Sequence, residues 1–229
     1  NENGMAEGQA LFDQEYECSF EAAIIGAYYA GELTLAQKDG RIGVVPFDPA
    51  LHVRTYWDMG LDDATAIWFG QLLGREIRLI EYQEFTGTAL TEVARMLMQK
   101  PYAYEKHILP HDAAVREMTT AKTRQASLDG IFGDGKSEIA PRLEVADGIN
   151  SVRVNFPRMW FDKIKCERGL EALRNYRKEW DEAKKSFENK PRHDWSSHGA
   201  DALRYLAMGF SDALTDSSQF LQQVVYLDR

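Results

Sequence analysis

Residues 51–85 read LHVRTYWDMGLDDATAIWFGQLLGREIRLIEYQEF, and this stretch decides the fold class of the chain. Within it, residues 51–57, 64–73 and 76–85 are rich in β-branched and aromatic side chains. Short polar or glycine-containing turns separate them. Strand-forming stretches joined in this way predict an antiparallel meander of three strands.

Helical and extended patterns alternate after the meander. Apolar residues recur at helical spacing over residues 90–100, and residues 108–110 predict a short strand that leads to Asp112. Further expected elements are helices over residues 119–131, 164–183 and 196–211, a helix capped by Asp147, a short strand over residues 142–146 and a polar loop over residues 187–194. This order predicts an α/β domain in which parallel crossovers extend an antiparallel meander, as in ribonuclease-H-like domains.

The bulk composition is that of a globular protein with an acidic balance. The chain has 229 residues, 44% of them hydrophobic, and a net charge of −9. Affinity for nucleic acid comes largely from cations on phosphates, so DNA contact would depend on local basic groups and on metal ions. No apolar run approaches the roughly 20 residues that span a bilayer, so we expect no membrane association. The two cysteines have no metal-ligand spacing, which fits a reducing compartment.

Three aspartates and a histidine are the candidate catalytic residues. Asp58 and Asp112 each follow a predicted strand, and ligands gather at the carboxyl ends of strands in α/β sheets. His198 and Asp201 are three residues apart on a predicted helix and therefore share one face. Carboxylate oxygens select Mg²⁺ or Mn²⁺, and two such ions suit phosphodiester cleavage. For Asp58 alone a turn-forming role is the alternative, for Asp112 a helix cap, and for His198 and Asp201 a solvent-facing pair.

Two residues near His198 have structural interpretations. Gly199 lies inside the predicted helix, where glycine costs roughly 1 kcal/mol relative to alanine, so we expect a strand or a ligand to approach closely there. Asp194 precedes the helix and is expected to cap it.

The segment GIFGDGKS, residues 130–137, matches the phosphate-binding pattern G-x-x-x-x-G-K-[ST]. A genuine loop of this kind follows a buried strand and opens a helix. Here a helix is predicted before it and a strand after it, so we interpret it as a glycine-rich surface loop.

Basic residues are candidates for DNA contact, although solvated helix faces are the usual explanation of such groups. Those assigned to this role are Arg124, Lys184, Lys185, Lys190 and Arg192. The last four stand immediately before His198 and Asp201 in the chain.

Three motifs carry a resemblance to a known family. They are YWDMGLDDAT (residues 56–65), LPHDA (109–113) and HDWSSHGADALRY (193–205), with weaker echoes in QEY (14–16) and GLEALRNYR (169–177). In these the chain resembles the C-terminal nuclease domain of the terminase large subunit, the DNA-packaging motor of tailed bacteriophages.

The resemblance implies a ribonuclease-H-like endonuclease that cuts concatemeric double-stranded viral DNA with Mg²⁺ or Mn²⁺. Asp58, Asp112 and Asp201 would hold the metal ions, with His198 beside them. It implies a linker from an ATPase domain over residues 1–48, the nuclease over 49–214 and a tail over 215–229. It further implies the portal protein and the terminase small subunit as partners, a monomeric isolated domain, and the cytoplasm of the infected host as location.

Two other classes of protein remain open from the sequence. Another ribonuclease-H-like nuclease, of the junction resolvase or transposase type, would share the carboxylates. A non-catalytic docking module of the motor would share the fold and the acidic surface.

Overall fold

The computed structural model describes residues 25–60, 64–116 and 121–208. Asp62 and Asp63 of the YWDMGLDDAT segment lie outside these residues. So does the predicted tail, 215–229.

A seven-stranded mixed sheet forms the centre of the molecule, in the order β1-β7-β4-β3-β2-β5-β6. In chain order the strands are β1 (Ile42–Gly43), β2 (Val53–Met59), β3 (Thr65–Leu73), β4 (Glu76–Phe85), β5 (Tyr104–Leu109), β6 (Ser137–Ile139) and β7 (Met159–Asp162). Strands β2, β3 and β4 pair antiparallel, and parallel pairings add β5 and β6 on one side and β7 and β1 on the other. The predicted meander and its parallel extension are confirmed, and the fold is ribonuclease-H-like.

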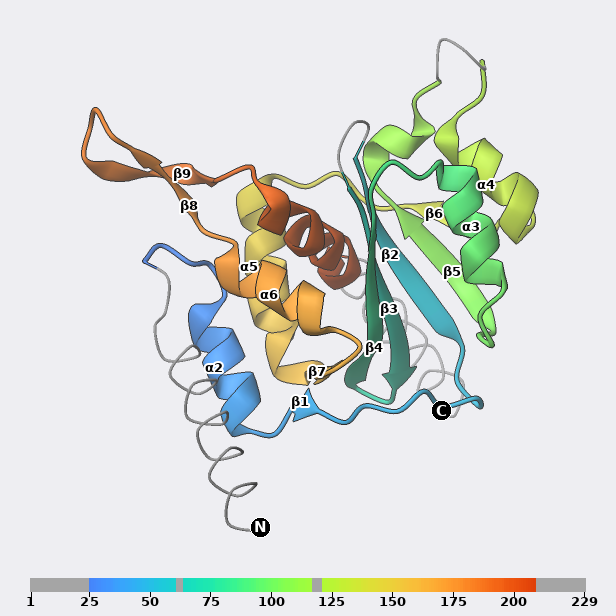
Figure 1. The fold of residues 1–229 in the computed structure, drawn as a ribbon, viewed down its shortest axis with the longest axis horizontal. Helices are drawn as coiled ribbons and strands as arrows, with labels where there is room; N and C mark the ends of the chain where they lie inside the picture. Colours follow the sequence, from blue (N-terminus) through green and yellow to red (C-terminus); the bar gives the residue numbers. More distant parts are fainter. Residues whose placement is uncertain (1–24, 61–63, 117–120, 209–229) are drawn as a thin grey trace, which may run out of the picture.

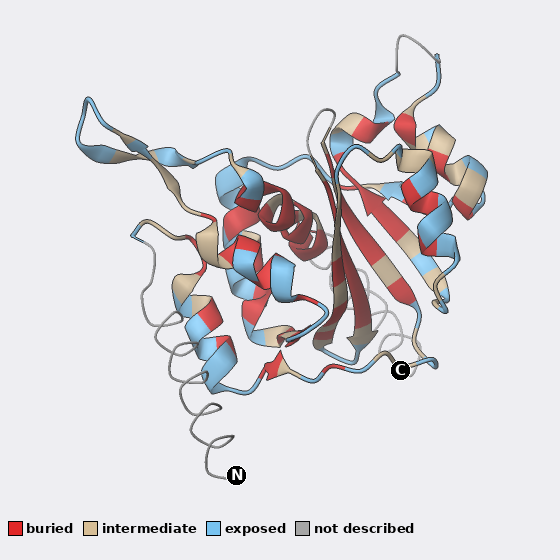
Figure 2. Cartoon of the chain, in the orientation of Figure 1, coloured by how far each residue is buried: buried red, intermediate tan, exposed pale blue. Residues whose placement is uncertain are grey.

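Both faces of the sheet are covered, and the central strand β3 is buried at its first seven positions. Along β2, Tyr56 belongs to one core and Trp57 to the other. Figure 2 shows the central strands as a nearly continuous buried layer. The short strands β1 and β6 form the two edges of the sheet.

Helices cover the sheet on both sides (Figure 1). One core is formed under α2 (Ala30–Lys38), α5 (Val145–Asn155), α6 (Glu167–Asn175) and a helix that spans at least residues 195–208. The other core lies under α3 (Leu90–Met98) and α4 (Arg124–Phe132), next to the short 3-10 turn η1 (His111–Ala114). A second 3-10 turn, η2 (Phe156–Arg158), leads from α5 into β7.

The predicted helix over residues 164–183 is wrong in its second half. Helix α6 ends at Asn175, and Tyr176 has an extended backbone with ψ of 107°. Strands β8 (Lys178–Asp181) and β9 (Ser186–Pro191) then pair as a separate hairpin, so the predicted loop over residues 187–194 is also mostly wrong. Trp180 packs edge-on against Phe187 across this hairpin, with ring centroids 4.8 Å apart. Trp180 therefore packs against the other strand of the hairpin and not on the apolar side of a helix. The hairpin projects away from the sheet in Figure 1.

The predicted strand over residues 142–146 is wrong as well. Helix α5 begins at Val145, and its first turn contains Asp147, which was expected to be the cap. Position 144 precedes the helix instead. Strand β7 was not predicted, because its four residues, MWFD, are too few to show a period.

Residues 25–48 are packed into the domain. Tyr29, Leu33 and Ala36 are buried in the core beneath α2, and Ile42 pairs with Phe161 in the sheet. The division at residues 48 and 49 stays a prediction about the whole chain, but packing continues across it in the described residues.

Candidate functional site

Asp58 is the last residue but one of β2 and faces the layer of helices that includes residues 195–208. Alternate residues of a strand share a face, so Asp58 lies on the side of Tyr56, whose ring is in that core. The Oδ2 atom of Asp58 is 3.2 Å from Nδ1 of His198. The structure therefore brings together two of the predicted site residues from positions 140 residues apart.

The helix that carries His198 begins with the predicted cap. The Asp194 carboxylate accepts the backbone N–H of Ser196 at 2.9 Å and the Ser196 hydroxyl at 2.6 Å. These bonds satisfy donors of the first helical turn that have no partner inside the helix. Asp194 is thus a structural residue, as predicted.

Gly199 lets this helix approach the sheet closely. A Cβ atom there would lie 2.8 Å from the Tyr82 hydroxyl on β4 and 2.9 Å from the Ala172 Cβ on α6. The indole N–H of Trp68 donates to the Gly199 carbonyl at 2.8 Å. The predicted close approach is confirmed, and protein atoms make it.

Asp201 stands one turn further along, partly exposed and held by protein donors. The Nη2 and Nε atoms of Arg204 lie 2.9 Å and 3.1 Å from its Oδ1. The Tyr176 hydroxyl donates to the same oxygen at 3.4 Å. Burial raises the pKa of Asp201 to about 6 and the charge of Asp58 adds to the rise, against the opposing charge of Arg204. The two carboxylates therefore repel each other across a site that would favour a cation.

Asp112 is at the same end of the sheet. Strands β2 and β5 are parallel, with Tyr56 opposite Ile108, so their carboxyl ends lie at the same end of the sheet. Asp112 follows β5 in η1, with 47% of its side chain exposed. Its Oδ2 lies 3.4 Å from Nη1 of Arg124, whose side chain is only 10% exposed. Arg124, predicted to contact DNA, thus packs beside a candidate ligand.

The phenol of Tyr205 is influenced by the charges of all three carboxylates. Burial raises the pKa of its phenol, and the negative charges of Asp58, Asp201 and Asp112 raise it further. All three carboxylates therefore lie within electrostatic reach of one hydroxyl. They do not form a closed set of ligands: among the described residues, no three His, Cys, Asp or Glu side chains are close enough together to hold a metal ion.

The other predicted DNA-contacting residues belong to the β8–β9 hairpin and its exit. Lys184 pairs with Asp181 at 2.8 Å, Lys185 with Glu182 at 2.9 Å and Lys190 with Glu188 at 3.0 Å. Arg192 lies 3.3 Å from Asp194, the helix cap. The three lysine side chains are between 65% and 75% exposed. Such exposed pairs are weak and exchange partners readily.

The glycine-rich segment over residues 130–137 has the context expected of a surface loop. It begins in the last turn of helix α4 and leads into β6, and Gly133 and Gly135 have φ of 103° and 72°. The Lys136 ammonium donates to the Tyr104 carbonyl at 3.0 Å. No strand-to-helix phosphate cradle is formed by these residues.

Two residues of the site were not predicted from the sequence, namely Arg204 and Tyr176. Both stand in motifs that carry the resemblance, and Arg204 is three residues after Asp201, the spacing of a helical ion pair. Tyr176 has no such signal, because α6 and the helix at residues 195–208 are joined only by tertiary packing.

A small cavity of about 190 Å³ is lined by residues that include His52, Arg54 and Glu105. These residues stand where β2 and β5 begin, at the opposite end of the sheet from Asp58. The cavity is therefore separate from the carboxylates.

The strand order and the covering helices define the ribonuclease-H-like fold, with Asp58 and Asp112 at the carboxyl ends of β2 and β5. Solved structures similar to this chain include phage large terminases. One of them, from a thermophilic bacteriophage and in complex with ADP, shares 19% identity over 74% of this chain and 42% of that one, with a TM-score of 0.57. This chain therefore spans less than half the length of that protein.

Two isolated nuclease structures are matched over most of their own length. The SPP1 large terminase nuclease domain with bound Mn is 16% identical, over 67% of this chain and 84% of that one, with a TM-score of 0.50. The nuclease from thermophilic phage G20c with bound magnesium is 14% identical, over 80% and 97%, with a TM-score of 0.51. Neither a protein-family model nor a curated protein sequence matches the chain. The chain has the fold of a terminase nuclease domain.

None of the described helices has the length and apolar character needed to cross a membrane.

Proposed function

We propose that this chain is a divalent-metal-dependent endonuclease that cleaves double-stranded viral DNA during genome packaging. The observation that supports this most is the position of Asp58 and Asp112 at the carboxyl ends of the parallel strands β2 and β5, with His198, three residues before Asp201, against Asp58. Solved domains of the same fold include terminase nucleases, two of them with Mn or magnesium bound.

The donor set fits Mg²⁺ or Mn²⁺. Asp58, Asp112 and Asp201 offer hard carboxylate oxygens, and the repulsion between Asp58 and Asp201 is relieved by a cation. One or, as we propose, two bound ions would supply activation of a water and stabilisation of the leaving oxygen. The three aspartates would hold the ions.

His198 has a distinct role in this proposal. Its Nδ1 faces the Asp58 carboxylate, and this contact fixes the orientation of the ring. We propose that the imidazole orders a water molecule or accepts a proton from it. His198 therefore assists the reaction while the aspartates carry the metal.

The test is nicking of a supercoiled plasmid with Mn²⁺ or Mg²⁺. We expect Asp58→Asn, Asp112→Asn and Asp201→Asn each to lower the rate at least roughly 100-fold, because a neutral amide cannot replace the charge of a carboxylate that ligates the metal. Circular dichroism should show that each variant is folded.

Glu105→Gln is the matched control, because Glu105 is an arginine-paired carboxylate at the other end of β5. It should cut at the wild-type rate. A wild-type protein that cuts nothing with either metal, or aspartate variants that cut normally, would overturn the proposal.

The partners and the setting belong to the same proposal. In the full motor the chain would meet double-stranded DNA, the portal protein and the terminase small subunit in the cytoplasm of the infected host. We propose that the isolated domain is a monomer.

Two rival functions predict different results. A junction resolvase or transposase-type nuclease would prefer branched DNA, so linear duplex and four-way junctions should be compared in one assay. A non-catalytic docking module would cut neither substrate and would bind a motor component without metal.

A further inference from the structure

The hydrogen bonds of Asp201 all end on one of its two carboxylate oxygens. Arg204 Nη2, Arg204 Nε and the Tyr176 hydroxyl all point to Oδ1. Among the described residues no hydrogen bond reaches Oδ2. The carboxylate is therefore oriented by three donors on one side, and its second oxygen is directed elsewhere.

The Arg204 side chain is itself closely packed. Its side chain is 11% exposed, and it packs against α5 at the point where that helix has a glycine. A Cβ atom on Gly148 would lie 3.1 Å from Arg204 Cδ and 3.5 Å from Nη1. The first of these distances is tighter than ordinary van der Waals contact, so a side chain at position 148 would push the Arg204 side chain by a few tenths of an ångström.

We propose that Arg204 is a positioning residue that locks the Asp201 carboxylate so that Oδ2 is presented to the metal, and that Gly148 makes room for this lock. The proposal rests on the proposed function, because it assigns Arg204 a role toward the metal that Asp201 would hold. Arg204 touches neither metal nor DNA in this role and acts only through Asp201.

Two opposite effects of the arginine decide the sign of the test. As a nearby positive charge it repels a dication, and on that ground alone its removal would tighten metal binding. As an orienting donor it keeps the carboxylate from turning and from being buried as an unpaired charge, and its removal would weaken binding. We expect orientation to dominate, because outer donors to metal ligands typically raise affinity by roughly 10- to 100-fold.

The first experiment measures Mn²⁺ binding to the full chain by electron paramagnetic resonance, without DNA and without turnover. Arg204→Met should weaken binding roughly 10- to 100-fold. Arg204→Lys keeps a single donor but loses the fork, so its Mn²⁺ affinity should fall between those of wild type and Arg204→Met. Arg153→Met is the control, because Arg153 is an arginine of α5 that donates to the Tyr28 carbonyl instead. It should bind Mn²⁺ like wild type.

A second variant removes the risk that loss of a buried arginine unfolds the protein. Gly148→Ala keeps Arg204 but crowds its seat, and we expect roughly three- to tenfold weaker Mn²⁺ binding. Alanine is the better helix former, so the fold should not suffer from the helix itself. Gly31→Ala in α2, where a Cβ meets nothing within 4 Å, is the matched control and should leave binding unchanged.

The outcomes separate the two proposals. Asp201→Asn must abolish the measured Mn²⁺ binding; if it does not, the metal site of the proposed function is wrong. If Asp201→Asn does abolish it but Arg204→Met and Gly148→Ala bind Mn²⁺ as wild type or more tightly, the positioning role alone is overturned. Should Arg204→Met fail to fold, Gly148→Ala decides the question.

Discussion

His107 shows how a single titratable residue is kept neutral inside this fold. Its ring is stacked on Phe132 with centroids 3.6 Å apart, and its Nδ1 lies 2.7 Å from the Thr55 hydroxyl. That hydroxyl in turn accepts the indole N–H of Trp57 at 2.7 Å. Burial lowers the pKa of His107 to about 3, and the charge of Lys136 contributes to the lowering.

This depressed pKa has a consequence for stability. An unfolded histidine binds a proton below about pH 6.5, whereas His107 in the folded chain stays neutral. The contribution of His107 to the stability of the folded protein is therefore complete above about pH 6.5 and declines as the pH falls toward 3. Between about pH 7 and pH 5, the free energy of unfolding of the wild-type protein should fall by about 2 kcal/mol more than that of His107→Gln. Urea denaturation at both pH values measures it.

The control is His52→Gln, which removes an exposed imidazole just before β2. It should keep the pH dependence of the wild-type protein. Equal slopes for His107→Gln and wild type would show that His107 gains its proton without unfolding cost.

Asp58, Asp112, His198 and Asp201 could be proposed from the sequence because each stands at a predicted strand end or on one helix face. Arg204 and Tyr176 could not be given a role in the same way. Their importance depends on which oxygen of Asp201 they reach, and that depends on how the helix at residues 195–208 sits on α6 and α5.

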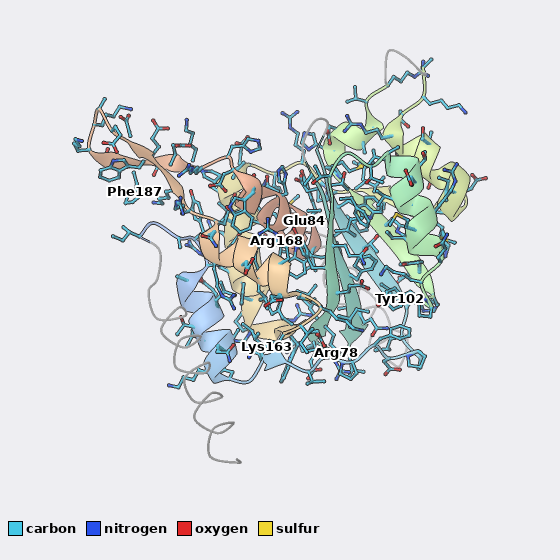
Figure 3. All side chains as sticks on the ribbon, viewed as in Figure 1. Arg78, Glu84, Tyr102, Lys163, Arg168 and Phe187 are labelled. Atoms are coloured by element: carbon cyan, nitrogen blue, oxygen red, sulfur yellow. The ribbon has the colours of Figure 1, made fainter. Side chains whose placement is uncertain are left out.

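At the scale of elements, α6 lies unusually close to the sheet. A Cβ atom on Gly169 would clash with the Trp68 ring on β3 and would lie 2.7 Å from the Tyr82 ring on β4. At such short distances the backbone of the helix or these two rings must move. In Figure 3, Arg168 of α6 and Glu84 of β4 lie close together, and Arg168 Nε donates to Glu84 Oε2 at 3.1 Å.

Gly169→Ala should therefore destabilise the protein by about 1–3 kcal/mol, the usual cost of overpacking, despite the better helix propensity of alanine. Chemical denaturation gives the change in unfolding free energy. Gly31→Ala, in the open part of α2, should instead stabilise by about 0.5–1 kcal/mol. A stabilising effect at both glycines would mean that the helix has room to shift.

The elements themselves were predictable where hydrophobic periodicity was long and unbroken. The meander and α3 lie within about two residues of their expected bounds. Residues 176–191 were not predictable, because Tyr176 and Trp180 continue the helical spacing of Leu170 and Leu173. Their partners are instead other segments, including Tyr28 for Tyr176 and Phe187 for Trp180. Packing between distant segments overrides a local pattern.

Because the whole molecule has a net charge of −9, DNA contact has to depend on local basic groups. The β8–β9 hairpin carries three exposed lysines and is therefore the segment to test. The exposed pairs of Lys184, Lys185 and Lys190 can be given up to phosphates at little cost. Changing all three to alanine should weaken binding to duplex DNA. It should also make the slope of log affinity against log salt shallower by about 0.9 for each phosphate that the hairpin no longer neutralises.

Fluorescence anisotropy with labelled duplex across a salt series measures both quantities. Lys38→Ala, an exposed lysine at the end of α2, is the control and should leave both unchanged. Mn²⁺ binding should be normal in every lysine variant. A triple variant with wild-type affinity and slope would remove the hairpin from the DNA-binding surface.

The outermost strands of the sheet are short, which limits pairing of the sheet with a second chain. β1 has two residues and β6 has three, whereas the interior strands β3 and β4 have nine and ten. A long open edge offers a row of unpaired backbone groups that a second chain can join, and it seeds insoluble fibres. Here each rim of the sheet offers only a few such groups. The long strands that would make good templates are enclosed, so they become available only when the domain unfolds.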